Sequence, residues 1–277
     1  MKKYSKESLW IRVILFFVIC TILIFCLQVF VLPLAENILN AGNEFPDTLA
    51  INIVRAMNGI VGIGLVYIFL SFDRQKMEIV GFKWNKDLGP EWMIIGIPIA
   101  ILALVPTVII EHFSGIITFG DLLGIFPIIL TLFVTILAIG LGEEILFRGY
   151  LQTILETRYS FPVSALVSAF LFGLLHFLLW TPTGKIENMV AILFSAGVIG
   201  ITFSYVFKTT KYNLILPVSI HGFWDFFLFI FQAEFEYTGF LEVVFEIFAS
   251  IVGAIIIFIL VYQYSLRRLK KFQWFNS

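Results

Sequence analysis

Residues 122–148 read LLGIFPIILTLFVTILAIGLGEEILFR. The first part of this stretch, residues 122–141, carries no charged side chain. Its length is what an α-helix needs to cross the ~30 Å hydrocarbon core of a bilayer. Two glutamates follow, Glu143 and Glu144, and Arg148 comes four residues after the second. The stretch therefore predicts a transmembrane helix with an ionisable cluster near one end.

The whole chain has the composition of a membrane protein. Of its 277 residues, 60% are hydrophobic and 13% are charged, whereas soluble domains carry about 25% charged residues. The formal net charge of −1 gives no basic surface for nucleic acid, so we expect no nucleic-acid partner. Cys20 and Cys26 lie in the first apolar run and lack the spacing of a zinc site, so we interpret them as packing residues.

Seven other apolar runs match residues 122–141 in character. Helices satisfy their own backbone hydrogen bonds within lipid, and the sequence lacks the alternation of a barrel. The predicted fold is an all-α, polytopic transmembrane bundle of about eight membrane-spanning helices, forming a single membrane domain over residues 1–277. The expected spans are residues 13–34, 49–70, 92–110, 122–141, 163–180, 189–207, 213–231 and 240–264.

The basic residues orient the predicted bundle. Sixteen of the eighteen Lys and Arg residues fall at the two ends of the chain or in the second, fourth and sixth connections, with Arg148 counted to the fourth. The exceptions are Arg55, inside a span, and Lys185. By the positive-inside rule both termini are cytoplasmic. The short loops favour a multi-pass protein of a prokaryotic plasma membrane.

Glu144 and Arg148 are four residues apart on one helix, so they can form an ion pair. Glu143 is rotated about 100° from Glu144, so Arg148 cannot serve both glutamates equally. Glu143 therefore needs another partner or a function. The alternative is that both glutamates are solvated at the cytoplasmic interface.

His176 lies in the next apolar run, in the pattern Phe172-x-x-x-His176. A turn near residues 159–162 separates the two segments. If the preceding helix continues to about Arg158, antiparallel packing places Glu143 and His176 at one depth, ~22–25 Å from the turn. A lone buried histidine is otherwise a hydrogen-bonded core residue.

A third polar pair, His221 and Asp225, shares a helix face, so that Asp225 can accept a hydrogen bond from the imidazole and fix its tautomer. The alternative is a polar clasp between helices. Together, Glu143, His176, His221 and Asp225 supply a base, two imidazoles and an orienting carboxylate. Arg55, also within a span, is interpreted as a structural partner of Glu242 or Glu246.

These motifs resemble those of the CPBP intramembrane proteases, the CAAX protease and bacteriocin-processing (Abi) family. Its pattern of E-E-x-x-x-R, F-x-x-x-H and H-x-x-x-N or D matches Glu143-Glu144-x-x-x-Arg148, Phe172-x-x-x-His176 and His221-x-x-x-Asp225. The motif region covers about residues 120–231. The resemblance implies an endopeptidase in which Glu143 and His176 activate water and His221 helps to stabilise the oxyanion. Asp225 stands where the family often has Asn, and it would orient His221.

The resemblance also bears on cofactors and partners. The family is commonly described as metalloproteases, so Glu143, His176 and His221 would be the ligands if zinc were bound, and a metal-free mechanism is equally open. The expected partners are a peptide or protein substrate in or at the membrane and the lipid bilayer. The alternatives are a non-catalytic bacteriocin-immunity or binding protein and a transporter or proton relay. The sequence predicts neither the substrate nor the oligomeric state.

Overall fold

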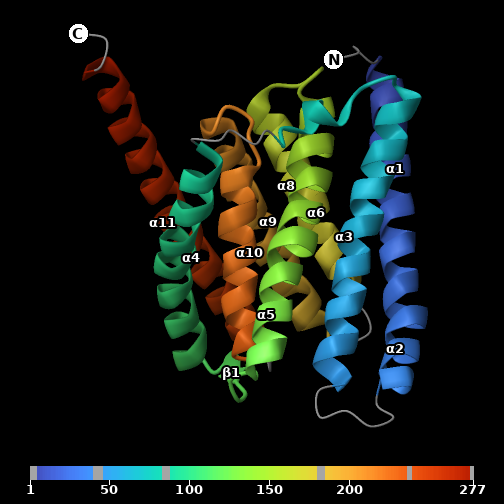
Figure 1. Cartoon of the computed structure of the whole chain (residues 1–277), viewed down its shortest axis with the longest axis vertical. Coiled ribbons are helices and arrows are strands. Elements are labelled where there is room, and N and C mark those ends of the chain that lie inside the picture. The colour runs from blue at the N-terminus through green and yellow to red at the C-terminus, as the bar shows by residue number, and fades with distance from the viewer. Residues whose placement is uncertain (1–4, 40–45, 83–87, 180–184, 236–238, 275–277) are drawn as a thin grey trace.

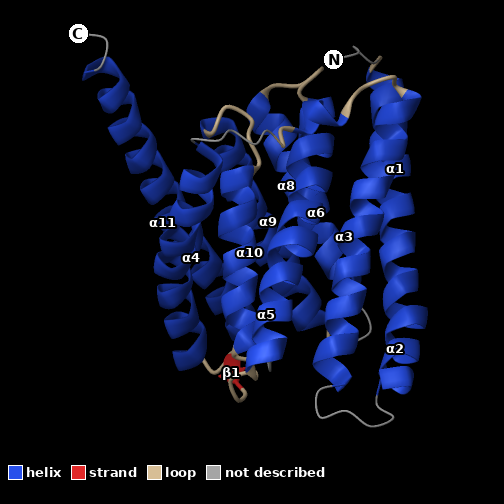
Figure 2. Cartoon of the chain, in the orientation of Figure 1, coloured by secondary structure: helices blue, strands red, loops and turns tan. Residues whose placement is uncertain are grey.

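The computed structural model describes residues 5–39, 46–82, 88–179, 185–235 and 239–274, and these form a bundle of roughly parallel and antiparallel helices (Figure 1). Helices account for nearly all of the described residues (Figure 2). The α-helices are α1 (Lys6–Cys26), α2 (Leu32–Leu39), α3 (Pro46–Phe72), α4 (Leu88–Phe113), α5 (Ile125–Phe133), α6 (Leu141–Glu144), α7 (Thr153–Leu155), α8 (Phe161–Leu179), α9 (Ile186–Thr209), α10 (Ile215–Ile230) and α11 (Phe240–Trp274). The π-helical segments are η1 (Leu27–Val31), η3 (Val134–Gly140) and η4 (Ile145–Gln152), and η2 (Met77–Val80) is a 3-10 turn.

The predicted all-α transmembrane fold is confirmed. Within the described residues, seven helical stretches are long and apolar enough to cross a membrane, and α10 is an eighth, shorter apolar helix. Both ends of the chain lie at the same end of the bundle, as an even number of crossings requires (Figure 1). The seven stretches are Lys6–Ile38, Leu49–Phe72, Gly89–Phe113, Ile125–Leu155, Phe161–Leu179, Ile186–Thr209 and Phe240–Leu266.

The fourth span is longer than the predicted 122–141. It runs without a break through α5, η3, α6, η4 and α7 to Leu155, so the glutamates lie inside it. The charges do not end the helix because Glu144 and Arg148 form an ion pair inside the bundle, as described below. Its π-helical segments leave carbonyls that other groups take up: Ser168 donates to the Phe147 carbonyl at 2.7 Å and Thr153 to that of Arg148 at 3.0 Å.

The seventh span, α10, is shorter than the predicted 213–231. Its 16 residues extend about 24 Å at 1.5 Å per residue. The helix starts within the packed bundle because Asn213 Oδ1 accepts from the Ile215 amide at 3.0 Å. The Leu214 amide donates to the Gly81 carbonyl, also at 3.0 Å. Every residue from 213 to 222 is buried, so the start of α10 holds His221 deep inside the molecule.

A two-stranded antiparallel sheet, which was not predicted, lies at the end of the bundle opposite the termini (Figure 2). Strand β1 (Ile117–Phe119) follows α4, and β2 (Ala233–Phe235) follows α10. Ile117 pairs with Phe235 and Phe119 with Ala233. The sheet therefore ties two connections together on this side.

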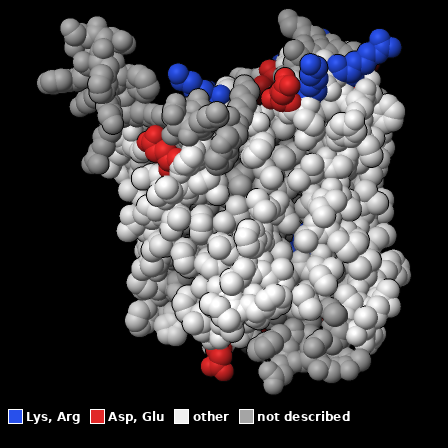
Figure 3. Space-filling model, in the orientation of Figure 1, with Lys and Arg blue, Asp and Glu red and all other residues white. Residues whose placement is uncertain are grey.

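Charged side chains follow the predicted orientation, with one correction. On the face shown in Figure 3, described Lys and Arg side chains gather mainly at the end that carries the termini. Arg148 was counted to a cytoplasmic loop, but it is fully buried in η4. The orientation survives this change because the remaining cationic positions are unaffected. Lys2, Lys3, Lys83 and Lys86 lie outside the described residues.

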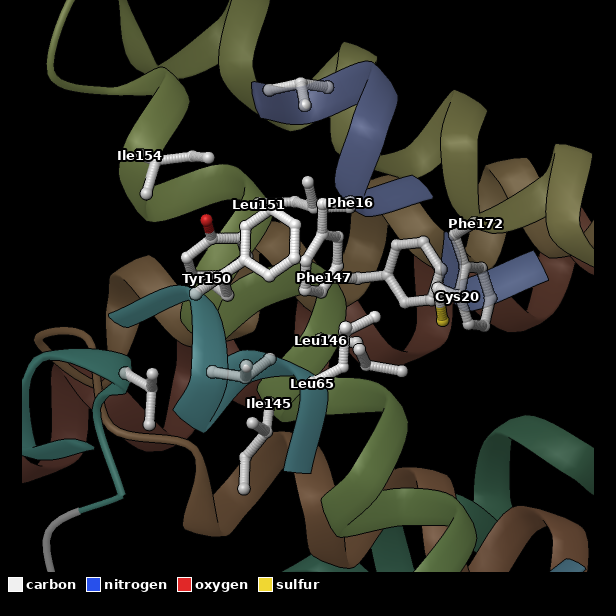
Figure 4. Packing of buried hydrophobic residues seen from close by; sticks show 14 of the residues in the cluster. Phe16, Cys20, Leu65, Ile145, Leu146, Phe147, Tyr150, Leu151, Ile154 and Phe172 are labelled. Carbon is white, nitrogen blue, oxygen red and sulfur yellow. The ribbon is translucent and has the colours of Figure 1, made fainter. Parts of the chain in front are cut away.

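The largest apolar core braces the helix that carries the glutamates. Phe16 of α1 packs against Tyr150 of η4, with ring centres 4.5 Å apart, and Phe147 packs edge-on against Phe172 of α8 at 5.0 Å (Figure 4). Cys20 is buried in the same cluster, and neither it nor Cys26 forms a disulfide. The interpretation as a packing residue is therefore confirmed for Cys20, whereas Cys26 is only partly buried.

At the end of the bundle that carries the termini, two turns are joined by a side-chain contact. The Tyr212 hydroxyl, between α9 and α10, donates to Glu156 Oε2 at 2.8 Å. Partial burial and the neighbouring Glu156 carboxylate raise the pKa of Tyr212 to about 12, so the phenol keeps its proton and the contact persists at neutral pH.

Candidate active site

Glu144 and Arg148 form the predicted ion pair at the centre of the bundle. Arg148 Nη1 donates to Glu144 Oε1 at 2.9 Å, and both side chains are fully buried. Arg148 Nη2 donates to the Gly200 carbonyl of α9 at 3.0 Å, and the guanidinium lies 4.6 Å from the ring centre of Phe172. The interpretation of Glu144 as a solvated interfacial residue is therefore wrong.

His221 is oriented by Glu144. Its Nδ1 lies 2.9 Å from Glu144 Oε1, the same oxygen that accepts from Arg148. Because an ionised carboxylate can only accept, this contact places a proton on Nδ1 and leaves Nε2 directed elsewhere. The ring of Phe203 stacks on the imidazole with a centroid distance of 5.1 Å. The contact at Nδ1 and the stacked ring of Phe203 together fix the orientation of the imidazole.

Asp225 does not have the predicted role of fixing the tautomer. Asp225 Oδ2 lies 3.6 Å from His221 Nε2, which is beyond a hydrogen bond but within ion-pair distance of a protonated imidazole. The physical reason is that α10 places His221 against α6, so that Nδ1 faces Glu144 and not Asp225. Asp225 instead faces the same nitrogen as Glu143.

Glu143 is the exposed member of the glutamate pair. Its side chain is 24% exposed, against 0% for Glu144, and its Oε2 lies 3.7 Å from His221 Nε2. Within the described part of the chain this Oε2 has no hydrogen-bond partner. The Glu143 carboxylate therefore lies beside an imidazole, and its Oε2 has no hydrogen-bond partner among the described residues.

His176 points its second nitrogen into the same space. Its Nδ1 lies 2.9 Å from the Phe172 carbonyl one turn earlier, and since a carbonyl only accepts, Nδ1 carries the proton. This is the only hydrogen bond that the ring makes among the described residues. Nε2 of His176 is then available as an acceptor.

A cavity of about 780 Å³ joins these groups. Glu143, His176, His221 and Asp225 all line it, whereas Glu144 and Arg148 lie behind its wall. The lining is mainly apolar, with a few converging polar groups, which is typical of small-ligand and peptide sites. The hairpin between the fourth and fifth spans thus brings Glu143 and His176 to one cavity.

The structure also places residues in the cavity wall that the sequence did not assign to it. Glu111 follows directly after the predicted span 92–110, but it lies in α4 and is 3% exposed. Arg55 was expected to pair with Glu242 or Glu246; among the described residues it forms no ion pair with either, and its guanidinium lies 3.6 Å from the ring centre of Phe229. Two acidic residues of the sequence could have indicated this part of the cavity. Glu111 lies at the end of the predicted span 92–110, and Glu246 lies near the start of the predicted span 240–264.

The predicted zinc ligands are Glu143, His176 and His221. Within the described ranges, no three or more His, Cys, Asp and Glu side chains are arranged to hold a metal ion. Glu144, which is not among the predicted ligands, holds His221 Nδ1. The described residues as placed therefore do not form a zinc site.

Comparison with known proteins gives one family. The family model described as type II CAAX prenyl endopeptidase Rce1-like matches residues 125–227, which run from the start of α5 into α10. This segment contains all six residues of the predicted site. A search of the curated proteins gave no match.

Proposed function

We propose that this chain, whose residues 125–227 match the model of the Rce1-like type II CAAX prenyl endopeptidases, is an intramembrane endopeptidase whose nucleophile is a water molecule activated by Glu143. The observation that carries the proposal is the buried Oε2 of Glu143, which has no hydrogen-bond partner among the described residues and lies 3.7 Å from His221 Nε2, in the wall of a cavity inside the bundle. A buried carboxylate with this freedom suits a general base.

The proposed reaction uses the two histidines differently. A water in the cavity donates one hydrogen to Glu143 and the other to Nε2 of His176, because both atoms are acceptors. Glu143 takes the first proton as the water oxygen attacks the peptide carbonyl carbon. When the C–N bond breaks, this proton passes to the leaving amine, so the carboxylate is regenerated.

His221 is the proposed donor to the oxyanion. Carboxylates face both of its nitrogens, Glu144 at Nδ1 and Glu143 and Asp225 at Nε2, so the ring can hold a second proton on Nε2. An N–H fixed in this position stabilises the negative charge that develops on the carbonyl oxygen. Asp225 supports the charged ring rather than touching the oxyanion.

In the proposed reaction no step depends on a metal ion. Within the protease class we also propose a prokaryotic plasma-membrane location and a substrate that is membrane-associated, such as a precursor with a leader peptide or a bacteriocin.

The test is cleavage by the purified full chain in lipid nanodiscs. The probes are internally quenched peptides: a farnesylated peptide with a CAAX C-terminus, the same peptide without the lipid, and an apolar leader-like peptide. We expect Glu143→Gln to lower the rate of the best probe at least 1,000-fold, since the base is lost, and Glu187→Gln, whose side chain lies outside the cavity wall, to cleave normally. Cleavage by Glu143→Gln at the normal rate would exclude this mechanism.

The same preparation addresses the metal. We expect less than one-tenth zinc per chain by elemental analysis and an unchanged rate after dialysis against a chelator. One zinc per chain, lost together with activity on dialysis and regained with it on adding zinc, would contradict the metal-free proposal.

A further inference from the structure

Arg55 is the only Lys or Arg among the described residues that line the cavity. It lies on α3, within the span Leu49–Phe72. A guanidinium keeps its positive charge in a protein, and such a charge inside a membrane is costly unless another group compensates it. Within the described ranges Arg55 forms neither a hydrogen bond nor an ion pair. Its charge therefore has no direct anionic partner in this part of the chain.

The guanidinium of Arg55 is positioned by an aromatic ring. Its central carbon lies 3.6 Å from the ring centre of Phe229 on α10, and Phe229 lines the same cavity. This contact positions the group without using a hydrogen bond, so its N–H donors stay available. The fork of donors on a guanidinium matches the two oxygens of a carboxylate.

Asn58, one turn further along α3, supplies a second group without a partner. Its Oδ1 is buried and accepts no hydrogen bond from the described residues. Asn58 and Arg55 are three residues apart on one helix, so they share a face, and both line the cavity. A buried acceptor without a partner is uncommon, and a peptide N–H would satisfy it.

Close packing places α3 beside the proposed base. A Cβ added to Gly142 would lie 2.8 Å from Gly59 Cα, so α3 touches α6 next to Glu143. Arg55 lies one turn before Gly59 on the same face of α3, which is about 6 Å along the helix axis. The guanidinium therefore belongs to the same cavity as Glu143 but lies at a different depth.

The second helix gives the same picture. Phe229 lies eight residues beyond His221 on α10, which is about 12 Å along the axis at 1.5 Å per residue. Because α10 leads into β2, Phe229 lies toward the sheet end of the bundle. The Arg55 guanidinium thus lies about 6–12 Å from the reacting groups, on the sheet side of them.

We propose that Arg55 and Asn58 form a subsite that binds a carboxylate of the peptide substrate. The subsite rests on the proposed function and adds to it a preference for an anion, either the C-terminal carboxylate or an Asp or Glu side chain. Arg55 donates to the carboxylate, and Asn58 Oδ1 accepts from a peptide N–H of the same segment. An extended chain spans 6–12 Å with about two to four residues, so the carboxylate lies about that far from the cut bond.

Asp225 is the alternative anion for Arg55. It lies one turn before Phe229 on α10, but its Oδ2 faces His221 Nε2 at 3.6 Å, and it forms no ion pair with Arg55 in the described part of the chain. If Arg55 served only to balance Asp225, it would matter equally for every peptide. A carboxylate subsite makes Arg55 matter only for peptides that carry the anion.

The experiment measures binding without cleavage. Fluorescent apolar peptides that end in a free carboxylate or in an amide are titrated with the full-length Glu143→Gln protein in neutral nanodiscs. A second pair of peptides, both amidated, carries Glu or Gln at one position that is scanned along the peptide. We expect the carboxylate to tighten binding at least ten-fold in one of the two pairs, because a bidentate charge-assisted contact is strong. The pair that responds identifies the source of the carboxylate.

Substitutions in the Glu143→Gln background test the residues. Arg55→Gln should reduce the preference to less than about two-fold while the neutral peptide binds as before, and Arg55→Lys should keep part of it, since the charge stays and the fork is lost. Asn58→Leu should weaken charged and neutral peptides alike, because both carry the peptide N–H. Lys208→Gln is the matched control: this cation lies over the Phe161 ring outside the cavity wall, so its loss should leave the full preference.

Each variant is first shown to be monodisperse and helical. Equal binding of charged and neutral peptides in both pairs would overturn the proposal, and so would a preference that survives in Arg55→Gln. An Arg55→Gln protein that binds charged and neutral peptides more weakly by the same factor would assign Arg55 a structural role instead. Carboxylate preference without cleavage of any probe by the wild-type protein would reject the proposed function and leave the subsite.

Discussion

Oε1 of Glu144 accepts from two buried groups, Arg148 Nη1 and His221 Nδ1, each at 2.9 Å. The first contact follows from spacing on one helix, so the sequence predicted it. The second could not be predicted, because it depends on how α10 packs against α6 within the bundle. For the same reason the sequence assigned the orienting role to Asp225.

At the scale of this residue we expect Glu144→Gln to lower cleavage by about 10–100-fold and also to destabilise the protein, because it leaves the Arg148 charge unpaired. Asp225→Asn should lower cleavage less. The double variant Glu144→Gln/Arg148→Met should regain thermal stability in detergent, while its cleavage stays low because a neutral amide at Nδ1 no longer stabilises the charged imidazole of His221. Recovery of cleavage together with stability would show that Glu144 acts only as a structural partner.

At the scale of elements, the site depends on close contact between α10 and η3. A Cβ added to Gly222, next to His221, would lie 2.8 Å from Ile136 Cα and 3.0 Å from the Thr135 carbonyl, and neither backbone can move cheaply. The apolar spans, and the connection between the fourth and fifth spans, could be predicted from the sequence. The π-helical segments and the start of α10 at Ile215 could not be predicted, since they arise from packing between segments.

We therefore expect Gly222→Val to push α10 away from η3 and separate His221 from Glu144. Cleavage should fall at least ten-fold, while the protein still inserts in the membrane because no span is altered. A matched substitution, Gly64→Val, is the control, since a Cβ there meets no atom within 4 Å. The measurement compares the cleavage rates of Gly222→Val and Gly64→Val with the same quenched peptide. Equal rates would contradict the packing argument.

At the scale of the whole molecule, the charge distribution predicts that the termini are cytoplasmic and that the β1–β2 sheet faces the other side. In a background without Cys20 and Cys26, a membrane-impermeant maleimide should label Glu234→Cys, an exposed position in β2, in intact cells. It should label Lys211→Cys, exposed in the turn before α10, only after the cells are permeabilised. The reverse pattern would place the termini outside.

The position of Glu143 restricts the conformation of anything that is cut beside it. Glu143 lies in the wall of a cavity inside the bundle, whereas the peptide carbonyls of an α-helix accept its own backbone hydrogen bonds and are surrounded by its own side chains. A membrane-embedded segment must therefore unwind before its peptide bond reaches Glu143. Unwinding exposes backbone groups within lipid at high cost, so segments interrupted by glycine or proline would yield most readily, and resistance to unwinding would protect the other helices of the membrane from attack.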